Sequence, residues 1–150
     1  MATNDLLQRL DTAALTTGSS DAASDRRRTE KFIAAGAIAA NALASFDLSQ
    51  TADSDKMLKV VAANSGTATA SIAFGVALGV AAIGDIVEVI VRGLATAAID
   101  GSGTAVAAGD GLVLSGTKLV KAVAGEAVVA QSVGAVSSDT TGKVYLINRF

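Results

Sequence analysis

Short runs of apolar and polar residues in alternation follow one another along most of this chain, and they occur in two similar sets. Each set has a short apolar run, a lysine-bearing run, a run of small residues and a valine-rich alternating run that ends near an arginine. A period of two over a few residues is typical of β-strands. The duplication predicts one β body in which each half covers the apolar face of the other. The first set comprises residues 38–46, 57–63, 72–78 and 84–93, and the second comprises 106–115, 118–125, 127–133 and 142–149.

Glycine recurs between these runs with asparagine, aspartate or serine, at residues 64–66, 84–85, 100–103, 109–111 and 139–142. These residue types favour tight turns. Many short strands joined by turns predict a mainly β fold, a small antiparallel β-barrel or sandwich built from the two similar strand sets. Proline, which often protects exposed edge strands, is absent. We therefore expect neighbouring subunits to cover the strand edges.

The most membrane-like segment is residues 32–46, which is 15 residues long. A helix needs about 20 apolar residues to cross a bilayer. The apolar run at 72–91 is longer, but glycine and acidic residues interrupt it. The sequence therefore predicts no membrane span.

Residues 1–31 differ in composition from the rest and are expected to form an N-terminal arm, extended or partly helical, ahead of a β-rich domain at 32–150. Leu6, Leu7 and Leu10 fall on one face of a short predicted helix. One interpretation is a frayed chain end. The other is an arm that orders on a neighbouring subunit, with the leucines as its anchor.

A dense basic cluster follows at Arg26, Arg27, Arg28 and Lys31, and acidic residues flank it so that the local charge nearly cancels. A solvated charged junction is one interpretation of this cluster. The second interpretation is a docking patch for an acidic surface on a partner.

Small residues dominate the apolar content. Hydrophobic residues make up 51% of the chain and charged residues 17%, but many of the former are alanine, and there are 15 glycines. Stabilisation by burial scales with area, at about 25 cal/mol per Å², so small side chains contribute little each. We therefore expect the protein to bury further surface against copies of itself or a partner.

The inventory of reactive groups is thin, so we expect neither an enzyme nor a cofactor. Histidine and cysteine are absent, the net charge is −2, and aromatic residues make up 3%, a composition that also argues against a nucleic-acid partner. Asp85 and Glu88 form the nearest carboxylate pair in the apolar region, but they fit a turn and an outward strand position. Asp100, Asp110 and Asp139 lie in glycine-rich turns, where a weak Ca²⁺ site stays open as an alternative to simple turn formation.

Residues 81–116 and 118–150 together resemble the head-decoration, or capsid cement, proteins of tailed bacteriophages. The similarity lies in a Gly-Asp turn, a valine-rich strand that ends in glycine, a second turn of sequence AAGD, a small-residue strand and a closing strand. These features correspond to Gly84 with Asp85 and to residues 87–93, 107–110, 128–130 and 144–150.

The resemblance implies a non-catalytic, usually trimeric protein on the outer capsid surface of the virion. Its partners would be the major capsid protein and its own copies, and it would bridge neighbouring capsid subunits to stabilise the head. The candidate docking residues of the arm are then Leu6, Leu7, Leu10, Arg26, Arg27 and Arg28. Two other classes stay open: another virion module of a tail, spike or fibre, and a bacterial surface β-repeat.

Overall fold

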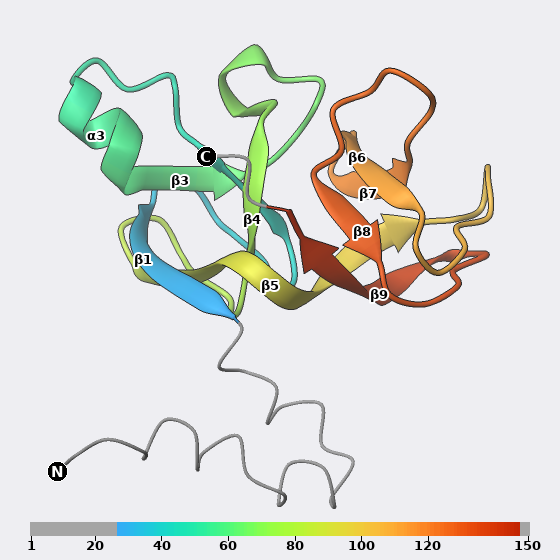
Figure 1. The fold of residues 1–150 in the computed structure, drawn as a ribbon. Helices are drawn as coiled ribbons and strands as arrows, with labels where there is room; N and C mark the ends of the chain where they lie inside the picture. The colour runs from blue at the N-terminus through green and yellow to red at the C-terminus, as the bar shows by residue number, and fades with distance from the viewer. Residues whose placement is uncertain (1–26, 148–150) are drawn as a thin grey trace, which may run out of the picture.

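The computed structural model describes residues 27–147, which form a mainly β fold (Figure 1). A six-residue helix, α3 (Asp53–Leu58), and a short 3-10 turn, η2 (Ala68–Ala70), interrupt the strands. No helix within residues 27–147 has the length and apolar character to cross a membrane. The strands are β1 (Arg28–Ala34), β2 (Leu43–Phe46), β3 (Lys59–Ala62), β4 (Ala73–Ala77), β5 (Ile86–Asp100), β6 (Gly111–Ser115), β7 (Lys118–Lys121), β8 (Ala130–Ser132) and β9 (Asp139–Leu146).

The nine strands of the described residues belong to one sheet, in the order β1-β3-β2-β4-β5-β7-β6-β8-β9. In two further pairings, the first strand of this order, β1, and the last, β9, each pair with the central strand β5. The predicted mainly β fold with two similar strand sets is confirmed. The sheet is mixed rather than antiparallel throughout, because β1 pairs with β3, and β5 with β7, in parallel.

Strand pairing repeats from one half to the other. In the first half β2 pairs with β3 and β4, and β4 pairs with β5. In the second half β6 pairs with β7 and β8, and β8 pairs with β9, again antiparallel. The long strand β5 belongs to both halves. Its beginning pairs with β1 in the first half, and its end pairs with β9 in the second half. The duplication seen in the sequence is therefore a duplication of topology.

Each of these strands pairs with at least two others within the chain. The strand edges are thus largely paired inside the protomer. Proline is therefore not needed to prevent the edges from pairing with another chain. The expected cover by neighbouring subunits is not required for the sheet.

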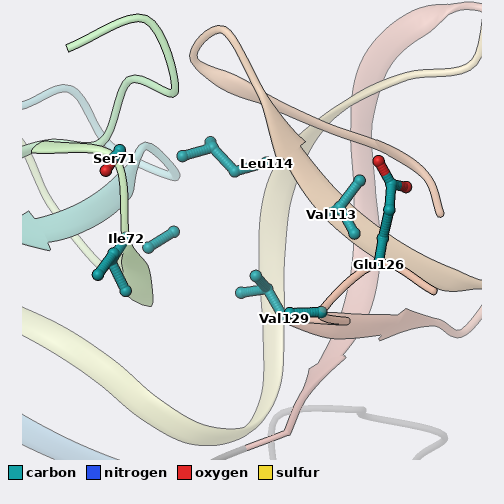
Figure 2. A pocket seen from close by; sticks show the side chains of 8 residues that line it. Ser71, Ile72, Val113, Leu114, Glu126 and Val129 are labelled. Atoms are coloured by element: carbon teal, nitrogen blue, oxygen red, sulfur yellow. The ribbon is translucent and has the colours of Figure 1, made fainter. Parts of the chain in front are cut away.

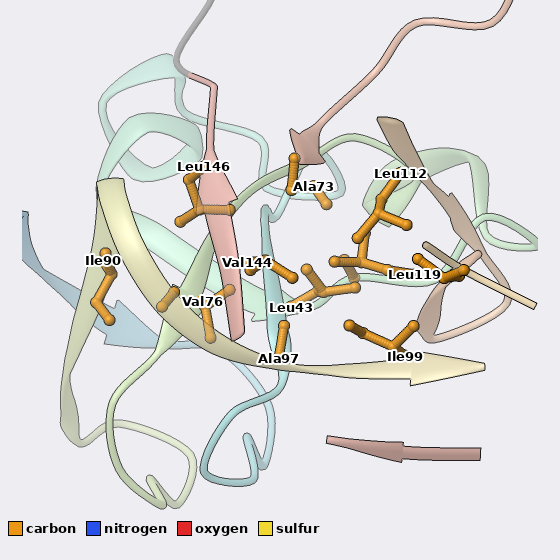
Figure 3. Packing of buried hydrophobic residues seen from close by; sticks show 14 of the residues in the cluster. Leu43, Ala73, Val76, Ile90, Ala97, Ile99, Leu112, Leu119, Val144 and Leu146 are labelled. Carbon is orange, nitrogen blue, oxygen red and sulfur yellow. The ribbon is translucent and has the colours of Figure 1, made fainter. Parts of the chain in front are cut away.

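Apolar side chains form two clusters, one on each side of β5. Val87, Val89 and Val91 at the beginning of β5 pack with Phe32 of β1 in one cluster. Gly93 follows with a φ of 95°, a conformation that favours glycine. Beyond it the strand contributes to the second, larger cluster (Figure 3). That cluster joins the halves, and its members include Leu43, Val76, Ile90, Ile99, Leu112, Leu119, Val144 and Leu146.

Candidate interaction surface

An apolar groove lies at the junction of the two halves (Figure 2). One wall is the start of β4 with Ser71 and Ile72, and the other is built from β6 and the segment before β8. Its volume is about 320 Å³. A smaller hollow of about 180 Å³, lined by Phe46 and Leu48, shares Ile72 with it. We call these two hollows, which share Ile72 in their linings, the Ile72 groove. The larger part is lined by Ser71, Ile72, Ala73, Val113, Leu114, Glu126, Ala127 and Val129.

The groove offers hydrophobic contact. Ile72 is 58% exposed and Leu48 is 45% exposed. Glu126 is the one ionisable residue in the lining, and its carboxylate accepts a hydrogen bond from the Val123 backbone at 2.8 Å. That carboxylate therefore closes a turn and lacks an acid–base partner in the groove.

Phe46, which lines the smaller hollow, packs with two further phenylalanines. Phe46 and Phe74 stack with ring centroids 4.1 Å apart, and Phe32 meets both edge-on, at 5.8 and 5.3 Å. Aromatic rings in such arrangements stabilise each other beyond their area burial. The wall is thus a preformed apolar surface.

The arm residues singled out in the sequence lie away from this groove or outside the described residues. Leu6, Leu7, Leu10 and Arg26 lie outside residues 27–147. Arg27 is exposed. In Figure 1 the beginning of β1 lies at the lower side of the molecule, whereas the start of β4 lies at the upper side.

The boundary assigned to the arm at residue 31 falls inside a strand. Arg28, Glu30 and Lys31 belong to β1, which pairs with β5. The Arg28 guanidinium contacts the Glu30 carboxylate at 2.7 Å on the same strand. Arg28 is therefore part of the body rather than of a segment ahead of it.

The carboxylates considered for Ca²⁺ are engaged in local contacts. Asp100 lies directly opposite Asp139 in the β5–β9 ladder, and Asp139 is paired with the Lys118 ammonium. Hydrogen bonds from the Ser102 hydroxyl and backbone lower the pKa of Asp100. The pairing with Asp139 raises the pKa of Lys118.

Asp110 lies in a separate turn. The Ala107 backbone N–H donates to it at 2.7 Å and lowers its pKa, with Lys121 contributing at 2.9 Å. Asp85 accepts from the Ala82 backbone in the same way, as expected for a turn residue. Residues 27–147 contain no group of three side chains suited to hold a metal ion.

Sequence reasoning missed the Ile72 groove. Residues 72–78 were predicted as one small-residue strand, but β4 begins at Ala73 and leaves Ile72 exposed ahead of it. The sequence does not show whether an apolar residue at a strand boundary is buried or exposed, because its burial depends on how neighbouring elements pack around it.

No family model matches the chain, and no curated protein matches it. Among solved structures, the fold is similar to the N base of the head fibre gp8.5 of bacteriophage phi29. The TM-score is 0.56 at 17% sequence identity, and the match covers 81% of this chain and 94% of the other. At this identity the similarity shows a shared fold.

Proposed function

We propose that this protein is a non-catalytic structural component of a tailed-phage virion, which binds the outer capsid surface as an oligomer. The observation that carries the proposal is the fold shared with the base of a phage head fibre, over nearly the whole of that base. The surface chemistry is consistent with it. The ionisable groups discussed above close turns or form ion pairs, and the groove is apolar.

Such a protein stabilises the head through linkage. A ligand that binds only the assembled lattice shifts the equilibrium toward assembly. Contacts that bridge two capsid subunits add their free energies through multivalency, so each contact can be weak. The proposed partners are the major capsid protein and copies of this chain, with a homotrimer as the expected oligomer.

In this proposal the segment before β1 docks on the capsid. Leu6, Leu7 and Leu10 supply the apolar anchor, and Arg26 and Arg27 supply charge for an acidic surface. Arg28 contributes from the beginning of β1, where its side chain is exposed beside Glu30.

Co-sedimentation with mature phage heads stripped of outer proteins tests this proposal. The full chain is expected to bind saturably at fixed stoichiometry. Deletion of residues 1–26 removes the three leucines and Arg26 from the docking residues and leaves β1 whole, because β1 begins at Arg28. The matched control replaces Met57, which is 72% exposed on α3, by alanine and should bind like the wild type. Failure of the full chain to sediment with heads would overturn the proposal.

A fibre component is the second candidate, because the similar structure is the base of a head fibre. Electron cryomicroscopy of decorated heads separates the two. Compact density over capsid subunit boundaries supports a bridging protein, and density that carries an extended fibre supports a fibre base.

A further inference from the structure

The loop between β4 and β5 carries large aliphatic side chains that point into solvent. Val80 is 82% exposed, Ile83 is 73% exposed, and Ile86 at the start of β5 is 72% exposed. Ile33 of β1 pairs directly with Ile86 across the sheet and is 39% exposed. We call these four residues the loop patch.

The second half of the protein shows that the fold does not need these side chains. Gln131 and Tyr145 pair in the second half as Val76 and Ile90 pair in the first, and both lie 55 residues later. The bridge residue Val136 lies 55 residues after Ala81, so the two loops correspond position by position.

In the second half, Ala135 and Ser138 of the loop and Thr141 of β9 stand where the loop patch has Val80, Ile83 and Ile86. All three are exposed as well. Between equivalent strand pairs and around an equivalent bridge, the second half therefore places small or polar residues at these three positions. The aliphatic residues of the loop patch consequently need another explanation than folding.

The loop patch is held in place before any partner arrives. Gly84 donates to the Ala34 carbonyl at 2.7 Å, and Ala34 donates to the Asp85 carbonyl at 2.8 Å. Ala81 and Ile38 exchange two hydrogen bonds of 2.9 Å. A preorganised apolar surface loses little conformational freedom on binding.

The surroundings of the loop patch suit a second copy of the chain. The next cross-strand pair on the same face of β1 and β5 is Lys31 with Glu88, one cation and one anion, and both are exposed. Two such surfaces do not repel each other, since each rim offers both signs of charge. Four aliphatic residues with a charged rim also have the anatomy of an interface, with an apolar centre depleted of charge and a polar border.

We propose that the loop patch is the surface through which copies of this chain associate, and this inference rests on the oligomer in the proposed function. The aliphatic side chains of the loop patch, which are exposed in the single protomer, become buried between protomers. The Ile72 groove stays available for a different partner.

Replacing three residues of the loop patch by the equivalent residues of the second half tests the inference. The variant carries Val80→Ala, Ile83→Ser and Ile86→Thr, which the same topology already accommodates 55 residues later. Sedimentation velocity over a range of concentrations should show an oligomer for the full-length wild type. The variant should dissociate with a Kd raised at least about 100-fold, because central apolar residues dominate interface energies. Circular dichroism checks its folding, and Ile83→Ser alone replaces it if the triple variant does not fold.

Val123→Ala is the matched control, because Val123 is 68% exposed on the segment between β7 and β8. It should leave the oligomer intact. A wild type that is monomeric at every concentration, or a variant that keeps the oligomeric mass, overturns the inference.

Head binding, measured on the same samples, separates this inference from the proposed function. A monomeric wild type that sediments with heads overturns self-association and leaves the proposed function standing. An oligomer that the variant disrupts, but that ignores heads, supports self-association and overturns the proposed function.

Discussion

Gly101 is the position at which one added methyl group should most disturb the second half. A Cβ built on Gly101 would lie 2.3 Å from the Val136 carbonyl oxygen and 2.8 Å from its carbon. These atoms belong to the backbone, so no side-chain rotation can relieve the contact. Val136 is itself fixed by two hydrogen bonds of 2.8 Å to Val106. Gly101→Ala must therefore move backbone by about 1 Å to reach ordinary contact.

The cost follows from two effects. Overpacking of this kind costs about 1–3 kcal/mol. The shift also strains the hydrogen bond of 3.1 Å from Gly101 to the Ser138 carbonyl, which is worth about 1 kcal/mol net. The free energy of unfolding should fall by about 2–4 kcal/mol. At roughly 4 °C per kcal/mol for a domain of this size, Tm should fall by about 8–16 °C.

Thermal unfolding followed by circular dichroism measures this effect, with Gly103→Ala as its control. Gly103 lies two residues further along the same turn, and a Cβ there would meet nothing within 4 Å. Its replacement should change the free energy of unfolding by less than about 0.5 kcal/mol. Equal effects at the two positions, or a Gly101→Ala variant as stable as the wild type, would refute the close approach of the turn to Val136.

Three further substitutions test the core, a buried carboxylate and a turn. Leu112→Ala, at a fully buried position, should lower the free energy of unfolding in urea by about 2–5 kcal/mol, whereas exposed Met57→Ala should change it by less than about 0.5 kcal/mol. Asp47 is 6% exposed, and hydrogen bonds, chiefly from the Ser49 hydroxyl, lower its pKa below the ordinary 3.8. Its contribution is therefore present above pH 3.8 and lost as the pH falls through the folded-state value, so Asp47→Asn should cost about 1–3 kcal/mol at pH 7 and progressively less as the pH falls below 3.8 in parallel urea titrations. Gly109→Ala forces a side chain to a φ of 89° and should cost about 1–2 kcal/mol in the same assay, while equal stability would show that the turn relaxes.

The strands that sequence predicted best are those with strong alternation. The valine-rich run at 84–93 forms the first part of β5, and the lysine-bearing run at 118–125 contains β7. The second part of β5 was not predicted as strand. Its residues Leu94–Asp100 include three alanines, which favour helices, and their strand conformation comes from seven consecutive pairs with β9.

Two other elements were missed for reasons of local sequence. β1 begins with Arg28, Thr29, Glu30 and Lys31, which gave the appearance of a charged linker. Their strand conformation depends on pairing with β5, which no local pattern reveals. The helix α3 was taken in part for a strand that began at Met57, although acidic residues in its first turn and Lys56 in its last complement the helix dipole.

The duplication separates what the fold requires from what it leaves free. Ahead of β4 and β8 the same offset of 55 residues makes Ala127 the counterpart of Ile72, and both line the groove between the halves. The groove is thus built from equivalent segments, but a large side chain stands on one wall and a small one on the other.

The loop patch shows the same asymmetry in stronger form, with Ile83 where the second half has Ser138. Positions that pair strands or close turns can be recognised in each half, because hydrogen bonding constrains both alike. Exposed positions that differ in size between equivalent halves are constrained by something outside the fold. At the loop patch those positions are aliphatic in the first half, so we expect this part of the first half to make contacts with neighbouring molecules.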